Sequence, residues 1–142
     1  VGVQHPLERD RVAAVLGARD LAVATSGAYE RGAHIVDPRT GRAPQGVLSV
    51  TVAGPDLGSA DAYATAAFAM GADGPAWTAT LRGYDALTIL ADGRVLSTPG
   101  MARLRLDSWQ GRAPGDGGAG YAGPCVIDAP PPSVSCAARS GE

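Results

Sequence analysis

The order of elements along the sequence predicts an α+β fold with a largely antiparallel sheet and packed helices. Residues 46–54 (GVLSVTVAG) alternate apolar and small side chains and are rich in β-branched residues, which is typical of a strand. Residues 59–70 (SADAYATAAFAM) have high helix propensity. Asp92-Gly93 is a strong two-residue turn signal, so residues 85–91 and 94–97 are expected to form a hairpin.

The N-terminal third is expected to contain short strands and one short helix. Residues 1–3 open as a strand, and the apolar spacing of residues 7–16 favours a short helix that begins near Pro6. Residues 20–26 (DLAVATS) predict a buried strand, and residues 33–36 predict another.

Turns and caps divide the remaining segments. Glu30-Arg31-Gly32 is expected to be an exposed turn, and Pro and Gly within residues 37–41 predict a chain reversal. Residues 55–58 are expected to form a loop. In the helix that follows, Ser59 is the candidate N-cap, Asp61 lies in the first turn and Gly71 is the stop, and residues 75–82 predict a weaker helix.

Composition limits the class of protein. The 142 residues suit one domain with a real core, since 45% of them are hydrophobic. The net charge is −2, and the 12 positive residues are scattered arginines, which argues against a nucleic-acid partner. No run of about 18 apolar residues is present, so no transmembrane segment is expected in this chain.

The pattern fades after Met101. Residues 102–142 are rich in Gly and Pro and are expected to form a poorly ordered tail, whereas residues 1–101 hold the folded part. Cys125 and Cys136 lie in this tail and are too few for the usual four-ligand zinc site. Whether they form a disulfide stays open.

Asp61 and Thr65 form a candidate metal site. They stand four residues apart on the most strongly predicted helix, so their side chains share one face. A carboxylate and a hydroxyl are hard oxygen ligands suited to Mg²⁺ that also binds substrate phosphates. The spacing alone also allows a plain structural reading, in which the Asp interacts with the helix dipole and the Thr bonds to its own backbone.

Other candidate groups lie near the predicted strands. His34 carries an imidazole, a group whose ordinary pKa of about 6.5 allows it to move a proton. A lone histidine in a strand is, however, commonly structural. Thr25-Ser26-Gly27 closes a strand with groups that could face phosphate. Arg39 and Arg42 could bind phosphate or be solvated charges of a turn.

Three segments, taken in order, resemble the C-terminal half of the ApbE-type FAD:protein FMN transferases. The similarity covers residues 1–101, with Met101 where an aromatic residue often stands and with Ala43 inserted before Pro44. The residues after Met101 resemble no family. The segments are ATSGAYERG (24–32), HIVDPRTGRAP (34–44) and LSVTVAGPDLGSADAYATAAFAMG (48–71).

This resemblance implies an α+β fold of the T-fold type and a Mg²⁺-dependent transfer of FMN from FAD to a threonine hydroxyl of a target flavoprotein, with release of AMP. It implies that Asp61 and Thr65 hold the Mg²⁺, and that His34 is a candidate base beside the flavin. Ile35 would touch the flavin nucleotide. Thr25, Ser26 and Gly27 would line the same cleft.

The resemblance also leaves alternatives open. The family's N-terminal half carries an A-K-G segment and most contacts to the adenosine of FAD, and this sequence does not contain them. The chain could therefore need a second half, act as a truncated, non-catalytic flavin-binding fragment, or hydrolyse FAD to FMN and AMP as some members do. The compartment stays open between the cytoplasm and an extracytoplasmic, membrane-anchored location.

Overall fold

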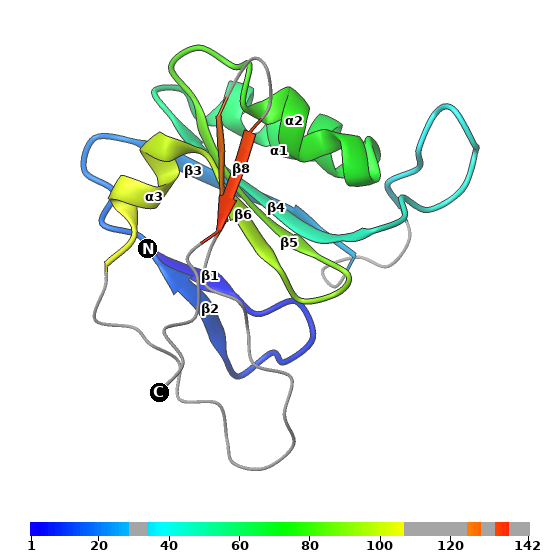
Figure 1. The fold of residues 1–142 in the computed structure, drawn as a ribbon, viewed down its shortest axis with the longest axis horizontal. Helices are drawn as coiled ribbons and strands as arrows, with labels where there is room; N and C mark the ends of the chain where they lie inside the picture. Colours follow the sequence, from blue (N-terminus) through cyan, green and yellow to red (C-terminus); the bar gives the residue numbers. More distant parts are fainter. Residues whose placement is uncertain (29–33, 107–124, 129–132, 137–142) are drawn as a thin grey trace.

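A six-stranded sheet and a separate two-stranded sheet form the framework of the described chain (Figure 1). The computed structural model describes residues 1–28, 34–106, 125–128 and 133–136. The larger sheet has the order β3-β4-β5-β6-β7-β8, and only the β6–β7 pair is parallel among its neighbours. The strands are β1 (Gly2–Gln4), β2 (Val12–Val15), β3 (Ala22–Gly27), β4 (Val47–Gly54), β5 (Asp85–Leu90), β6 (Val95–Ser97), β7 (Cys125–Asp128) and β8 (Ser133–Cys136). The α+β architecture with a largely antiparallel sheet is therefore confirmed.

Strand β4 is the centre of the folded part. It pairs with β3 along six residues and with β5 on its other side, and nearly all of its side chains are buried. Successive side chains of a strand point to opposite faces. Val50 and Val52 therefore face one layer, while Thr51 and Ala53 face the other.

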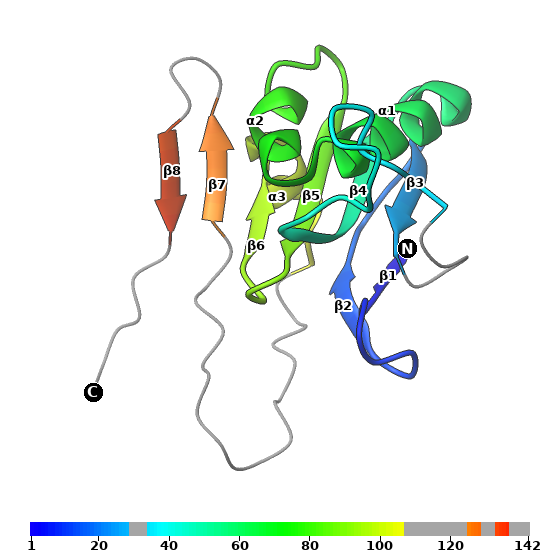
Figure 2. The same ribbon diagram turned by 90° about the vertical axis from the view of Figure 1, so that its right-hand side faces the viewer.

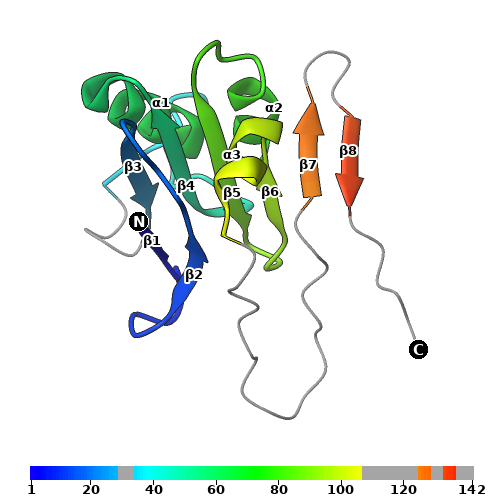
Figure 3. The same cartoon turned by 90° about the vertical axis from the view of Figure 1, so that its left-hand side faces the viewer.

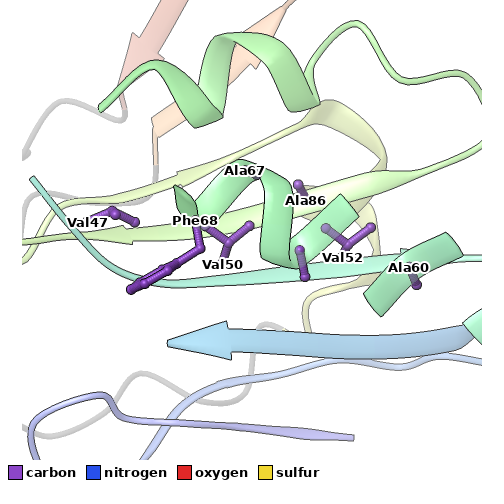
Figure 4. Packing of buried hydrophobic residues seen from close by; sticks show 8 residues of the cluster. Val47, Val50, Val52, Ala60, Ala67, Phe68 and Ala86 are labelled. Atoms are coloured by element: carbon purple, nitrogen blue, oxygen red, sulfur yellow. The ribbon is translucent and has the colours of Figure 1, made fainter. Parts of the chain in front are cut away.

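Helix α1 (Leu57–Ala69) covers one face of this sheet over β3 and β4 (Figure 1). Figure 4 shows the layer between them, where Ala60, Ala67 and Phe68 of the helix lie against valines of β4 and Ala86 of β5. Alanine side chains are small, so the helix axis can come close to the strands. The complete cluster of buried residues is Val47, Val50, Val52, Ala60, Ala64, Ala67, Phe68 and Ala86.

The opposite face of the sheet packs against the β1–β2 ribbon and helix α3 (Pro99–Leu104). Met101 of α3 is fully buried there beside Leu87 and Ile89 of β5. Figures 2 and 3 show the two layers from the sides, with β3 at one edge of the sheet and β7–β8 at the other. The sheet is thus covered on both faces near β4 and β5.

The start of α1 differs from the prediction. Asp56 is the N-cap, because its extended backbone lets the side chain accept a hydrogen bond from the Ser59 amide at 2.7 Å. Ser59 is therefore inside the helix, and residues 57–58 are helical where a loop was expected. For the same reason Asp61 lies beyond the first turn.

Residues 7–16 do not form a helix. Their C-terminal part is strand β2, in which Val15 pairs with Gly2 and Ala14 with Val3 of β1. The β-branched valines of this segment suit a strand, and pairing with β1 satisfies the backbone groups that a helix would have satisfied internally. Tertiary pairing therefore outweighs the helix-like apolar spacing.

The segment around the predicted turn is only partly as expected. Residues 34–36 have no regular structure where a strand was predicted, and residues 30–33 lie outside the described residues. The reversal at residues 37–41 is confirmed, because the amides of Thr40 and Gly41 both donate to the Asp37 carbonyl. The backbone amide of Asp37 donates to the carbonyl of Arg42, which closes the turn.

The hairpin β5–β6 is confirmed. Asp92 accepts a hydrogen bond from the Arg94 amide, and Gly93 has the positive φ of 85° that its place in the turn requires. A 3₁₀ turn, η1 (Gly71–Asp73), follows α1, and α2 (Gly74–Thr78) is shorter than predicted. Helix α3 was not predicted, nor were β7 and β8, which lie in the segment 102–142 that was expected to be poorly ordered. The rest of that segment after residue 106 lies outside the described residues.

The glycine after α1 provides a test of backbone packing. Gly71 has a φ of 60°, and a Cβ there would lie 2.6 Å from the Gln45 carbonyl oxygen, whereas Gly83 has a φ of 76° with open space around it. We expect Gly83→Ala to lower the free energy of unfolding by about 1 kcal/mol, because alanine is strained in the left-handed backbone. We expect Gly71→Ala to lower it by about 2–3 kcal/mol, because the clash with the Gln45 backbone is added to the same strain. Urea unfolding of both variants measures the difference. Equal losses would contradict the role of the Gln45 contact.

Candidate functional site

A cavity of about 940 Å³ opens between α1, the C-terminal end of β3 and the segment 34–38. Its volume falls within the range of small-molecule sites, roughly 300–1,000 Å³. All seven site residues predicted from the sequence lie in its wall. The lining residues are Thr25, Ser26, Gly27, His34, Ile35, Val36, Pro38, Asp61, Ala62, Thr65, Ala66 and Ala69.

One face of α1 forms the helical wall. Asp61 and Thr65 are both exposed on this face, one turn apart as their spacing predicted. Ala62, Ala66 and Ala69 continue the same wall and were not predicted as lining residues. The 3.6-residue period could have identified them, since they recur on the face that Asp61 defines.

Hydroxyl groups connect β3 to its two neighbours. The Ser26 hydroxyl shares a hydrogen bond of 3.1 Å with the Thr65 hydroxyl, which joins the strand to the helical wall. Thr25 shares a hydrogen bond of 2.9 Å with Thr51, its cross-strand partner on β4. Because Thr51 is fully buried, this pair fixes β3 against β4 at the point where β3 enters the cavity wall.

The irregular segment 34–38 forms the opposite wall. His34 and Val36 are exposed, while Ile35 is half-buried and packs against the core cluster under α1. Ile35 therefore anchors this segment by burial of its apolar side chain. His34 and Val36, on either side of it, are left facing the cavity and solvent.

The arginines of the turn lie beside the cavity and not in its wall. Hydrogen bonds from the Arg39 side chain and backbone hold the pKa of the buried Asp37 carboxyl below its usual value. The carboxylates of Asp37 and Asp73 in turn raise the pKa of Arg39. Neither Arg39 nor Arg42 lines the cavity. The two guanidiniums of the turn are therefore not placed to bind a phosphate within it.

Asp61 and Thr65 have the chemistry to hold Mg²⁺. Within the described part of the chain, no hydrogen bond or ion pair occupies the Asp61 carboxylate. The described residues include no cluster of three or more His, Cys, Asp or Glu that could hold a metal by themselves. One carboxylate with a hydroxyl fits Mg²⁺ in particular, because this ion commonly binds one or two carboxylates and completes its shell with substrate phosphates and water.

The family model for the "ApbE family" matches residues 1–88, which is more than half of the chain. The chain belongs to the ApbE family. The segment matched includes β3, the segment 34–38 and α1, so the whole cavity wall lies within it. This agrees with the resemblance drawn from the sequence motifs.

Two curated relatives, both named FAD:protein FMN transferase, are similar to this chain. The chain is 37% identical to an FAD:protein FMN transferase of Rhodobacter capsulatus over 123 residues, and 41% identical to one of Treponema pallidum over 120 residues. These matches cover 80% and 75% of this chain. The chain spans only 23% and 33% of the length of those two relatives, so it corresponds to a part of each.

Solved structures share the fold. The ApbE protein of Thermotoga maritima matches with a TM-score of 0.64 and 32% identity, over 75% of this chain and 38% of that one. The flavin transferase ApbE of Vibrio cholerae matches with a TM-score of 0.52 and 27% identity, over 68% of this chain and 39% of that one.

None of the helices in the described residues is long and apolar enough to cross a membrane.

The Asp37–Arg39 pair predicts how stability responds to acid. A carboxyl whose pKa is lowered by folding stabilises the fold fully above its unfolded value, 3.8, and loses this contribution as the pH falls through the lower folded value. We expect wild type to be more stable than Asp37→Asn at neutral pH, and the gap to narrow below about pH 4. Thermal unfolding of both proteins across pH measures the gap. A gap that stays constant in acid would contradict the pairing.

Proposed function

We propose that this chain forms part of the active site for a Mg²⁺-dependent transfer of FMN from FAD to a threonine hydroxyl of a target flavoprotein. The observation that carries the proposal is that one cavity is lined by four polar groups. They are the Asp61 carboxylate, which has no partner among the described residues, the hydrogen-bonded hydroxyls of Ser26 and Thr65, and His34. The names of the curated relatives supply the reaction class. Because the chain spans only a part of those relatives, the proposal concerns its share of the site.

Asp61 and Thr65 would hold Mg²⁺ from the helical wall. When bound, the ion would neutralise charge on the pyrophosphate of FAD and favour departure of AMP. Ser26 holds the Thr65 hydroxyl through the 3.1 Å hydrogen bond, so the hydroxyl oxygen is oriented before any ligand binds. Thr25, Ser26 and Gly27 would contact the same phosphates from the end of β3.

His34 would act as the base on the opposite wall. In the transfer, the threonine oxygen of the acceptor attacks the phosphorus of the FMN moiety, its proton passes to the imidazole, and the bond from that phosphorus to the oxygen of AMP breaks. His34 is exposed, so an acceptor segment can reach it. Ile35 beside it would give the flavin nucleotide an apolar contact.

The carboxylate of Asp61 provides the first test. We expect Asp61→Ala to abolish the increase in FAD affinity that Mg²⁺ gives, and to lower any AMP release about 100-fold, since the charge that develops on the leaving group loses its counterion. Flavin fluorescence during titration with FAD and Mg²⁺ reports binding, and chromatography reports AMP, free FMN and flavinylated acceptor peptide.

Asp10→Ala is the matched control for this test, because Asp10 is an exposed carboxylate outside the cavity and should change neither reading. Normal Mg²⁺ dependence in Asp61→Ala would remove the metal assignment. Free FMN in place of flavinylated peptide would assign hydrolysis to the same site. Binding without AMP would show that these residues are only a share of the catalytic machinery.

The alanine-lined helical wall provides a second test. Ala62 is exposed and lines the cavity, so we expect Ala62→Phe to fill the space and weaken FAD binding about 10-fold or more while the fold is retained. Ala76→Phe is the control, because Ala76 is also an exposed helical alanine but lies on α2 outside the cavity. Equal FAD affinity in the two variants would show that FAD does not use this cavity.

A further inference from the structure

The side chain of Arg39 connects two parts of the molecule that are separate in sequence. Its Nε and one terminal nitrogen donate to Asp37, at 3.2 and 3.1 Å, within the turn itself. Its other bonds reach away from the turn, to the Asp73 carboxylate at 2.8 Å and to the Met70 carbonyl oxygen at 3.1 Å. Met70 is the C-cap of α1 and Asp73 ends η1, so this guanidinium bridges the turn and the end of the helix.

These two parts carry opposite walls of the cavity. The turn directly follows residues 34–36, which with Pro38 form one wall, and α1 forms the other. In the described chain, the hydrogen bonds from residues 37–42 to other segments are those of Arg39 with Asp73 and Met70. The remaining bonds of the turn are internal, so they shape it without attaching it to α1.

We propose that Arg39 is a positioning residue that sets the spacing of the cavity walls by fastening the segment that carries His34 and Ile35 to the C-terminal end of α1. The expected effect on FAD binding rests on the proposed function, whereas the bridge that Arg39 makes does not. Arg39 does not line the cavity, so it acts through the segment and not by contact with a ligand.

The geometry requires an arginine. A planar guanidinium presents several fixed donors and can serve three acceptor groups at once, whereas a lysine ammonium on its flexible stem cannot reproduce that fork. Arg39 is 59% exposed and Asp73 is 72% exposed, so salt should weaken this ion pair. The more buried Asp37 partner should be screened less.

The test compares Arg39→Gln with Arg42→Gln, since both remove one positive charge from the same turn. The chain contains two histidines, so the imidazole signals of His34 and His5 can be followed separately by NMR. In Arg39→Gln we expect the His34 signal to shift or broaden, amide exchange in residues 37–42 to accelerate about 10-fold, and FAD affinity to fall about 10-fold. Arg42→Gln should leave all three readings unchanged, and Arg39→Lys should recover them only in part.

Identical exchange and His34 signals in the two glutamine variants would overturn the proposal. If Arg39→Gln unfolds the whole chain, a salt titration of the wild type decides: the His34 signal should move while circular dichroism stays constant, and an unmoved signal would overturn the proposal. If wild type does not bind FAD, the proposed function fails. The His34 signal and amide exchange still decide whether Arg39 holds the segment.

Discussion

Burial of β4 on both faces is the constraint on which the rest of the structure depends. Val50 and Val52 pack against the alanines of α1. Thr51 and Ala53 point to the other face, toward α3 and the β1–β2 ribbon. Burial on both faces fixes the register of β4, because a slip of one residue would exchange its two sets of side chains. The neighbouring strands β3 and β5 take their positions from that register.

The cavity follows from the same register. Pairing of Thr25 with Thr51 places the next residue of β3, Ser26, on the face of the sheet that α1 covers, where it meets Thr65. The helix can lie this close because the residues it buries against β4 are mostly alanines. The Ser26–Thr65 hydroxyl pair therefore depends both on the register of β3 and on the small residues under α1. The Asp61 carboxylate lies one turn before Thr65 on the same helical wall.

Sequence patterns predicted the elements whose stability is local. The hairpin at Asp92-Gly93 and the body of α1 were predicted because turn chemistry and helix propensity act over a few residues. Strand β2 was mistaken for a helix, since its conformation depends on β1. The spacing of Asp61 and Thr65 indicated their shared wall, but their proximity to Ser26 and to residues 34–36 depends on packing between segments far apart in sequence. Periodicity along one element cannot report that packing.

The order of strands also separates the candidate site from β7 and β8. The cavity lies at the β3 edge of the sheet, whereas β7 joins it at the β6 edge through a parallel pairing of two residues, Leu96 with Cys125 and Ser97 with Val126. Strands β4, β5 and β6 lie between β3 and β7 in the order of the sheet, as Figures 2 and 3 show. A change within β7 or β8 therefore acts at the opposite end of the sheet from the candidate site, and its effect must cross three paired strands before it reaches the cavity wall.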